Sequence, residues 1–451
     1  MIKLNDISQT KTVFLVLFMS FLALLPAWLN YDIISRDGAF QYVPSAILFY
    51  EGQFKEALLG RTLPLFPMLI ALVARITGLD FELSGRLISG CCFLIAAAGI
   101  FKVSEIIFRN RWISLISVLF LITNRDLIER SIDCLKESLL LCFVLWGNYF
   151  ILKGVLQGYR NKNLVLGGAI LFLGGLVRST SLIFLGAWLV IWVFHKRKHV
   201  IPRALLLVVP AIAFFLLWYF DPSLPIFRKS FKLSKLFHTI PGISGLLYST
   251  YIIVSNFIST GNPFIMVIGC FGLYQYRNDR YKTHVFIVFA FFYMMMIRMG
   301  HTGMQNQRYI LAPIVWFYPL AAYAVVSWLS APGKVKKSIA VIVVLAACLF
   351  WAGRAFAPPD SDKLARKKAG EYILFQAGPE QRVLTNRDRL AFYAKGEYVK
   401  LNAESDIDNP HLIIAVDVLK DEGREVKSRL DAIRKTPANQ FNNIYIYLPE
   451  S

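Results

Sequence analysis

Long apolar segments recur through most of this 451-residue sequence, from Val13 to Phe356. Hydrophobic residues make up 56% of the chain and charged residues 17%, whereas a typical soluble domain has about 25% charged residues. A run of roughly 20 apolar residues can cross a bilayer as a helix. The sequence therefore predicts an all-α, multi-pass membrane domain and excludes an ordinary soluble globular protein.

About eleven membrane spans are predicted from these runs. The first, Val13–Leu29, lacks a small-x-small cleavage site and is interpreted as a retained helix instead of a signal peptide. The full set is Val13–Leu29, Arg86–Phe108, Trp112–Thr123, Cys134–Leu152, Leu164–Val177, Thr180–Phe194, Arg203–Tyr219, Pro263–Tyr276, His284–Met299, Tyr309–Leu329 and Ser338–Phe356.

The orientation follows from clusters of Lys and Arg, which mark cytoplasmic loops. Such clusters occur near 109–111, 153–162, 196–198, 277–282 and 334–337, on alternate turns. They define one side only if Leu63–Leu79, which holds two prolines and Arg75, lies along the interface as a juxtamembrane helix. The N-terminus is then cytoplasmic and the C-terminus extracytoplasmic, in a plasma or inner membrane.

The last part of the chain has a different composition. Residues 358–451 carry 15 basic and 15 acidic side chains, so the net charge of +20 lies in residues 1–357. Strand-like runs at Gln381–Thr385, Leu412–Val418 and Asn443–Leu448 and a helical pattern at Glu422–Arg434 predict a small α/β domain. We expect two domains, 1–357 in the membrane and 358–451 outside it.

The six cysteines lie in or beside apolar spans and follow neither a disulfide nor a zinc-binding pattern. The basic residues flank spans instead of covering a soluble face, which argues against nucleic acid as a partner. No cofactor is predicted, and a divalent metal is possible but not indicated.

Asp37 is the first candidate for chemistry, in the stretch "SRDGAFQYVP" (35–44) after the first span. An aspartate there can be a solvated loop residue or a helix cap. Alternatively, Arg36 keeps it ionised, Gly38 permits an irregular turn that brings Tyr42 near, and Asp37 acts as a general base.

The stretch 124–143 supplies a second group of ionisable residues. Arg130, Asp133 and Glu137 lie at the predicted start of a span. They form either an ion-paired helix start, which suits the helix dipole, or a site with a second carboxylate facing Asp37.

Four further positions on the same predicted side are basic or aromatic. Arg61 precedes the juxtamembrane helix, and Arg178 lies between two short spans. Arg308 and Tyr309 open a late span after His301. Arginines there either extend to lipid head groups or bind a lipid-linked phosphate.

Together these stretches resemble the C superfamily of glycosyltransferases (GT-C), in the branch of the protein O-mannosyltransferases and the aminoarabinose lipid A transferases. The matching motifs are Arg36-Asp37-Gly38 with Tyr42, Pro64-Leu65-Phe66-Pro67 after Arg61, Arg130 with Asp133, and Arg308-Tyr309-Ile310-Leu311-Ala312-Pro313. Gly38 stands where the mannosyltransferases have an acidic residue.

The resemblance implies inverting transfer of a sugar from a polyprenyl-phosphate donor to a lipid, glycan or protein acceptor. Asp37 would be the base and Asp133 would help to position the acceptor. Arg61, Arg308 and Tyr309 would bind the donor phosphate, and Tyr42 would contact the acceptor. Arg36, Arg130, Glu137, Arg178 and His301 are secondary candidates.

Three other functions fit the same residues. A transporter or flippase of lipid-linked sugars would need no base, and a polymerase or ligase would use diphosphate-linked glycans. A receptor or assembly subunit would depend on the tail and not on Asp37.

The predicted orientation can be tested with a reporter enzyme fused after Pro358. We expect activity that requires export, because the last span should carry the chain outward. A fusion at Gly333, in a predicted cytoplasmic turn, is the control and should give the opposite signal. A cytoplasmic signal at Pro358 would move the proposed site to the other face.

Overall fold

A computed structural model describes residues 8–31, 33–59, 62–156, 161–194, 243–276, 279–301, 307–356, 358, 360–401, 412–418, 421–434 and 437–448. The chain divides into two compact units. The membrane unit comprises Met1–Leu29 and Ser45–Phe356, and the tail unit comprises Asn30–Pro44 and Ala357–Ser451. The tail unit thus includes the segment that carries Asp37.

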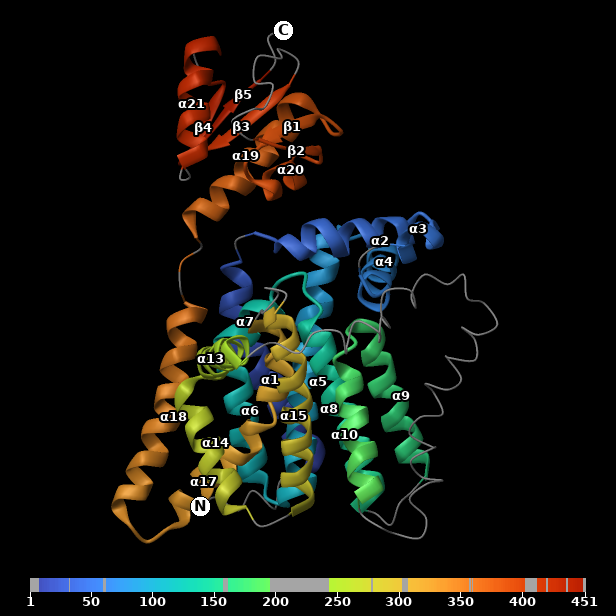
Figure 1. Ribbon diagram of the computed structural model, residues 1–451, viewed down its shortest axis with the longest axis vertical. Helices are drawn as coiled ribbons and strands as arrows, with labels where there is room; N and C mark the ends of the chain where they lie inside the picture. The colour runs from blue at the N-terminus through green and yellow to red at the C-terminus, as the bar shows by residue number, and fades with distance from the viewer. Residues whose placement is uncertain are drawn as a thin grey trace. The chain divides into compact units, whose positions relative to one another are not determined.

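The membrane unit is built from helices (Figure 1). Five stretches among the described residues are long and apolar enough to cross a bilayer: Gln9–Leu29, Phe81–Phe108, Glu137–Leu156, Leu311–Ser330 and Lys334–Gly353. The helices are α1 (Gln9–Leu29), α3 (Phe54–Leu59), α4 (Leu65–Thr77), α5 (Phe81–Phe108), α6 (Arg111–Ile122), α7 (Arg125–Ser131), α8 (Glu137–Leu156), α9 (Asn161–Val177), α10 (Ser181–Phe194), α13 (Ile243–Gly261), α14 (Pro263–Gln275), α15 (Asp279–His301), η4 (Gln307–Tyr309), α16 (Leu311–Ile314), α17 (Phe317–Ser330) and α18 (Lys334–Ala355).

Each predicted span except Arg203–Tyr219, which falls outside the described residues, overlaps one of these helices. The sequence missed α13, which Figure 1 shows nearly end-on, across the direction of α5 and α8. The predicted juxtamembrane segment Leu63–Leu79 contains α4, which begins after Pro64 and ends at Gly78, where φ is +71°. A multi-pass helical membrane fold is thereby confirmed, whereas the number of spans stays a prediction.

The predicted span Tyr309–Leu329 overlaps the stretch Leu311–Ser330, which is long and apolar enough to cross a bilayer but is not one regular helix. The chain forms η4, α16 and α17 in succession, with a break at Val315 and Trp316. Pro319 has no N–H to donate to the carbonyl of Val315, and the tighter bond from Tyr318 N to Val315 O (3.3 Å) takes its place.

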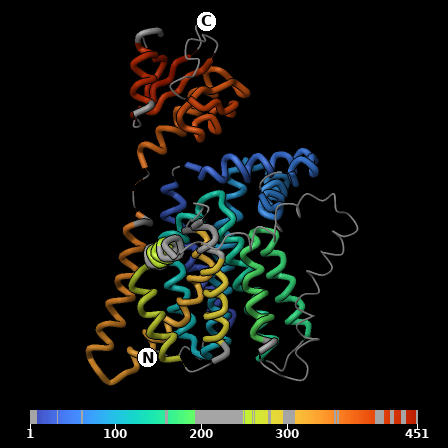
Figure 2. Tube along the Cα trace, viewed as in Figure 1, coloured from blue at the N-terminus to red at the C-terminus, as the bar shows by residue number. Residues whose placement is uncertain are grey.

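Small residues let the helices approach closely. Gly167 of α9 packs on α8, where an added Cβ would lie 2.7 Å from the carbonyl oxygen of Gly147. Gly272 of α14 is tighter, because a Cβ there would lie 1.9 Å from the carbonyl oxygen of Leu320 in α17. Such contacts stabilise helix pairs where lipid removes the usual hydrophobic driving force. Figure 2 shows α8, α9 and α10 running alongside one another.

The tail unit contains a five-stranded sheet in the order β2-β1-β3-β5-β4. Strands β1 and β2 are parallel, as are β1 and β3, whereas β5 runs antiparallel to both β3 and β4. The elements are α19 (Ser361–Ala377), β1 (Arg382–Thr385), α20 (Asp388–Tyr393), β2 (Glu397–Lys400), β3 (Ile413–Asp417), α21 (Asp421–Arg434), β4 (Asn439–Phe441) and β5 (Ile444–Tyr447). The three predicted strand-like runs and the predicted helix are confirmed.

Alternating side chains build two cores on the faces of this sheet. Val383 and Ile413 face α19 and α20, whereas Leu384 and Ile414 face α21. The sheet therefore lies between helices (Figure 1). The segment before α2 (Val43–Tyr50) contributes a π-helix, η2 (Gly38–Tyr42), to this unit.

The close approach of α14 and α17 predicts a sharp difference between two glycines. Gly272→Ala should lower the thermal stability of the purified protein, because overpacking costs about 1–3 kcal/mol. Gly186→Ala in α10 is the control, since a Cβ there meets nothing within 4 Å. Unfolding in detergent measures both, and equal midpoints would contradict the packing.

Candidate functional site

Three side chains and one backbone carbonyl, from three parts of the membrane unit, meet at one end of its helices. Arg178 Nη1 lies 3.4 Å from Glu137 Oε1 and donates to the carbonyl oxygen of Arg308, also at 3.4 Å. The Arg178 guanidinium carbon lies 3.9 Å from the centroid of the Tyr309 ring. The guanidinium thus joins a carboxylate, a carbonyl and an aromatic face.

Local structure explains why these residues meet. Glu137 is the first residue of α8, and Arg178 directly follows α9, where its N–H bonds to the carbonyl of Gly174 at 2.9 Å. A carboxylate at a helix start and a cation at a helix end both suit the helix dipole. Arg308 and Tyr309 lie in the short turn η4, which α16 follows.

The ion pair is buried. The side chains of Arg178 and Glu137 are 7% and 2% exposed. Removal from water costs both charges hydration, so each depends on the other for compensation. Glu137 Oε2 and Arg130 Nε are buried and have no hydrogen-bond partner within the described part of the chain. Besides the atoms that form the ion pair, this end of the membrane unit therefore has a buried acceptor and a buried donor that are available for a further hydrogen bond.

Asp133 lies in the turn between α7 and α8 and is 9% exposed. Its Oδ1 accepts a hydrogen bond from Cys134 N at 2.6 Å. Two side chains of α5 bind this turn. Arg86 Nε donates to Ile132 O at 3.0 Å, and Ser89 Oγ donates to Leu135 O at 2.7 Å. The turn that carries Asp133 is thereby bound to α5, a helix of 28 residues.

The sequence reasoning did not single out Arg86, which binds the turn that carries Asp133. It also donates to Trp28 O at 3.4 Å and lies over the Trp28 ring at 4.5 Å. The available signal was an arginine opening an otherwise apolar predicted span, since ionisable residues at membrane depth are functional by default.

Asp126 on α7 was also missed. Burial raises its pKa, while the charge of Arg130, four residues on, opposes the increase. Asn124 caps α7 through Leu127 N and donates to Tyr318 Oη and Thr260 O, both at 2.8 Å. The i, i+4 spacing of Asp126 and Arg130 was the sequence signal.

Asp37, Arg36 and Tyr42 belong to the tail unit. Asp37 directly precedes η2 at its N-cap position, with helical backbone angles, and its side chain makes no cap hydrogen bond there. Its Oδ1 accepts from Gln41 Nε2 at 3.0 Å. Tyr42 is 2% exposed, and Val43 N bonds to Gly38 O across the π turn. The predicted irregular turn at Gly38 is thus present, and π turns are frequent at functional sites.

Two predicted site residues cannot be placed. Arg61 falls outside the described residues, and His301 ends α15 with its side chain outside them. Their roles stay predictions. The part of the chain that the structure describes holds no group of three or more His, Cys, Asp and Glu residues able to bind a metal ion.

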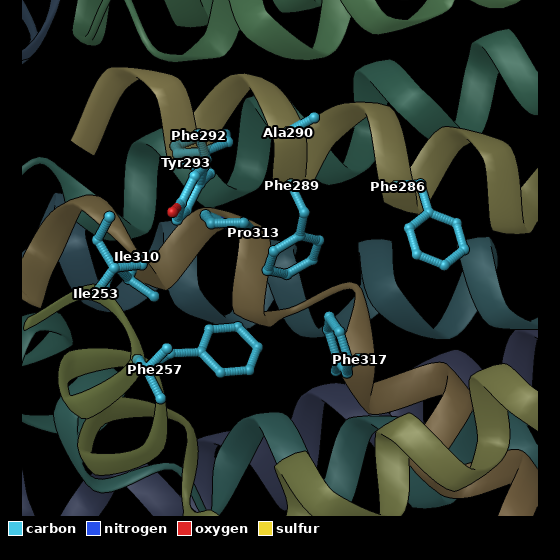
Figure 3. A pocket seen from close by; sticks show the side chains of 11 residues that line it. Ile253, Phe257, Phe286, Phe289, Ala290, Phe292, Tyr293, Ile310, Pro313 and Phe317 are labelled. Atoms are coloured by element: carbon cyan, nitrogen blue, oxygen red, sulfur yellow. The ribbon is translucent and has the colours of Figure 1, made fainter. Parts of the chain in front are cut away.

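An apolar groove of about 450 Å³ is lined in part by Ile310, the residue that directly follows the Arg308–Tyr309 turn (Figure 3). Its lining comes from α13, α15 and the chain that follows η4: Ile253, Val254, Phe257, Phe286, Phe289, Ala290, Phe292, Tyr293, Ile310, Pro313 and Phe317. Phe286 is 61% exposed, so the groove opens at the surface. Tyr293, one of the lining residues, shares a hydrogen bond of 2.7 Å with Thr250 Oγ1 through its hydroxyl.

The chain is similar to proteins of known structure. Residues 61–220 match the family of dolichyl-phosphate-mannose-protein mannosyltransferases. The structure of ArnT from Cupriavidus metallidurans bound to undecaprenyl phosphate matches with a TM-score of 0.64 at 10% identity, over 97% of this chain and 98% of ArnT. Its apo form gives 0.63.

A second solved protein shares the fold. The Archaeoglobus fulgidus oligosaccharyltransferase, in complex with Zn and sulfate, matches with a TM-score of 0.57 at 11% identity, over 92% of this chain and 69% of that one. No protein of curated function matches in sequence. The family match covers residues 61–220, and the fold shared with ArnT and the oligosaccharyltransferase agrees with the resemblance to GT-C glycosyltransferases predicted from the sequence.

The buried ion pair predicts a specific pattern of stability. Arg178→Met leaves the Glu137 carboxylate buried without compensation, so we expect a loss of about 3–5 kcal/mol. Adding Glu137→Gln to that variant should recover part of it, because the isolated charge is then removed. Thermal unfolding in detergent is the measurement.

The matched control is Arg125→Met. Arg125 pairs with Glu129 at 3.0 Å, but these side chains are 59% and 34% exposed. An exposed pair contributes about 0–1 kcal/mol, so this variant should unfold close to the unmodified protein. Similar losses for Arg125→Met and Arg178→Met would mean that burial does not set the difference.

Proposed function

We propose that this chain transfers a sugar from a polyprenyl-phosphate donor to a lipid, glycan or protein acceptor at the outer face of the membrane, with inversion at the anomeric carbon. ArnT, whose fold it shares, was solved with undecaprenyl phosphate bound. The matched family is described as using a dolichyl-phosphate sugar. Both support a polyprenyl-phosphate-linked donor.

The observation that carries the proposal is the position of the apolar groove beside the Arg308–Tyr309 turn. Ile310 and Pro313 line the groove directly after that turn. A polyprenyl phosphate is complementary to this arrangement, because its anionic head matches the basic turn and its long apolar tail matches the groove. The head would lie at Arg308 and Tyr309, and the first isoprene units would follow between α13 and α15.

Arg308 is the proposed phosphate-binding cation in the described part of this site. The carboxylate of Glu137 already balances the charge of Arg178. Arg178 instead holds the turn in place, through Arg308 O and the ring of Tyr309. Guanidinium groups bind phosphate oxygens through paired, charge-assisted hydrogen bonds. Arg61 is proposed as a second cation from its sequence position.

The reaction breaks one bond and forms one. A lone pair of the acceptor oxygen or nitrogen attacks the anomeric carbon, and the bond from that carbon to the phosphate oxygen breaks on the opposite face. The acceptor proton passes to Asp37, and the bonding electrons leave with the lipid phosphate. Arg308 stabilises the charge that develops there, which lowers the barrier in a water-poor site.

The remaining residues have supporting roles in this scheme. Asp133, fixed by α5, would orient the acceptor. Tyr42 and His301 stay sequence-based candidates for acceptor contact and for activity. The described residues do not assemble three metal ligands, so no step is assigned to a metal.

The proposal includes the topology. It has eleven spans and a cytoplasmic N-terminus. The transfer step would then take place at the extracytoplasmic face of the membrane. The basic loops support this orientation through the positive-inside rule.

A donor screen tests the function. Purified protein in vesicles should release lipid phosphate and form glycosylated acceptor from a monophosphate-linked sugar. Activity only with diphosphate-linked donors would favour a polymerase or ligase. Movement of the lipid-linked sugar across the vesicle without any transfer would favour a transporter.

The catalytic assignment is tested by Asp37→Asn, which removes the base and keeps the shape. General-base catalysis contributes about 10²–10⁴-fold, so the transfer rate should fall by that factor. Glu56→Gln on α3, an exposed carboxylate, is the control and should transfer at the unmodified rate. An unchanged rate in Asp37→Asn would show that Asp37 is not the base.

A further inference from the structure

The segment that carries Asp37 packs on the tail unit, more than 300 residues later in the chain. Residues Asn30–Pro44 and Ala357–Ser451 form one compact unit. Helix α20 packs against the π turn η2, which begins directly after Asp37. The chain between these two parts, Ser45–Phe356, belongs to the membrane unit. The two parts are therefore held together by tertiary contacts and not by closeness in the sequence.

Two hydrogen bonds hold the backbone of Ile34. Its N–H donates to Tyr393 Oη at 3.0 Å, and its carbonyl accepts from Arg389 Nη1 at 3.5 Å. Ile34 is 0% exposed and Tyr393 is 8% exposed. Since a buried N–H without a partner costs about 1–3 kcal/mol, the Tyr393 hydroxyl holds this strand of chain firmly.

Two further contacts continue along the segment. Arg36 Nε lies 2.7 Å from Asp388 Oδ2, and the Phe40 and Tyr398 rings lie 6.3 Å apart. The Arg36 side chain is 79% exposed, so this ion pair stabilises the segment less than the buried bond to Tyr393. Contacts therefore flank Asp37 on both sides.

Hydrogen bonds within the turn at residues 35–41 connect the held backbone of Ile34 to the Asp37 carboxylate. Gly38 N donates to Ser35 Oγ at 3.1 Å, and Ala39 N donates to Ser35 O at 3.0 Å. Gln41 Nε2 then bonds Asp37 Oδ1 at 3.0 Å. The chain from Ile34 to Gln41 is thus connected by hydrogen bonds at short intervals, and moving Ile34 moves the carboxylate.

We infer that the tail unit is a positioning device for Asp37, and that Tyr393 is the residue through which it acts. This inference rests on the proposed function, in which Asp37 is the base. It assigns the tail unit to the transfer step itself, instead of to a separate binding or assembly task. Tyr393 touches neither donor nor acceptor in this scheme and acts through Ile34.

Tyr393→Phe tests the inference, because it removes the hydroxyl and keeps the ring. A misplaced catalytic group costs up to about 10²-fold, so we expect kcat to fall by about 10- to 100-fold. The KM for the donor should stay unchanged, since the proposed donor site lies in the membrane unit. Normal kcat, or an increase in KM alone, would overturn the inference.

The matched control is Tyr447→Phe. Tyr447 is a buried phenol of the same unit, 1% exposed, and its hydroxyl donates at 2.7 Å to Asp431 Oδ1, an acceptor that does not belong to the segment 30–44. Its loss should leave kcat near the unmodified value. Equal falls in kcat for both variants would mean that the tail unit affects the reaction only through its general stability.

Hydrogen exchange gives a readout that does not need activity. In Tyr393→Phe the amides of residues 33–43 should exchange about tenfold faster, while those of β3 and β5 stay protected, because one buried hydrogen bond is lost. Unchanged exchange at 33–43 would show that Tyr393 does not hold the segment.

The two hypotheses fail in different ways. If the donor screen finds no sugar transfer, the proposed function falls. If transfer occurs but Asp37→Asn retains the rate, Asp37 is not the base, and the positioning role of Tyr393 falls with that assignment. If Asp37→Asn is inactive but Tyr393→Phe has normal kcat, Asp37 remains the base and only the positioning role is lost.

Discussion

The buried ion pair between Glu137 and Arg178 is the constraint on which the polar end of the membrane unit depends. Each charge has lost its hydration and is tolerable only because the other lies 3.4 Å away. The pair joins the start of α8 to the end of α9, and Arg178 also binds the Arg308 carbonyl and the Tyr309 ring. One desolvated guanidinium therefore fixes the turn that borders the apolar groove.

The two aspartates of the proposed mechanism are held by separate structures. Asp133 lies in a turn bound to Arg86 and Ser89 of α5, within the helical bundle. Asp37 lies in a segment bound to α20, within the α/β tail unit. In the proposed mechanism, the base and the phosphate-binding arginine therefore belong to parts of the chain with different folds.

Much of the fold was predictable, because the length of an apolar run and the alternation of apolar and polar residues along a strand are local signals. The predicted spans other than Arg203–Tyr219, the segment Leu63–Leu79 and three strands of the tail each overlap an observed element. The break at Val315 and Trp316 and the helix α13 were not predicted. The first follows from the bonds around Pro319, and the second from a mixture of apolar and hydroxyl residues that fits no simple span.

The sequence by itself determined which residues are candidates for the chemistry. Asp37, Asp133, Glu137, Arg178, Arg308 and Tyr309 stand out because charge and aromatic polarity are rare in so apolar a chain. Only the tertiary structure decided their partners. Arg178 meets Glu137 and Tyr309, and Tyr393 meets Ile34 across more than 300 residues, because packing and desolvation select these contacts, and no local pattern records them.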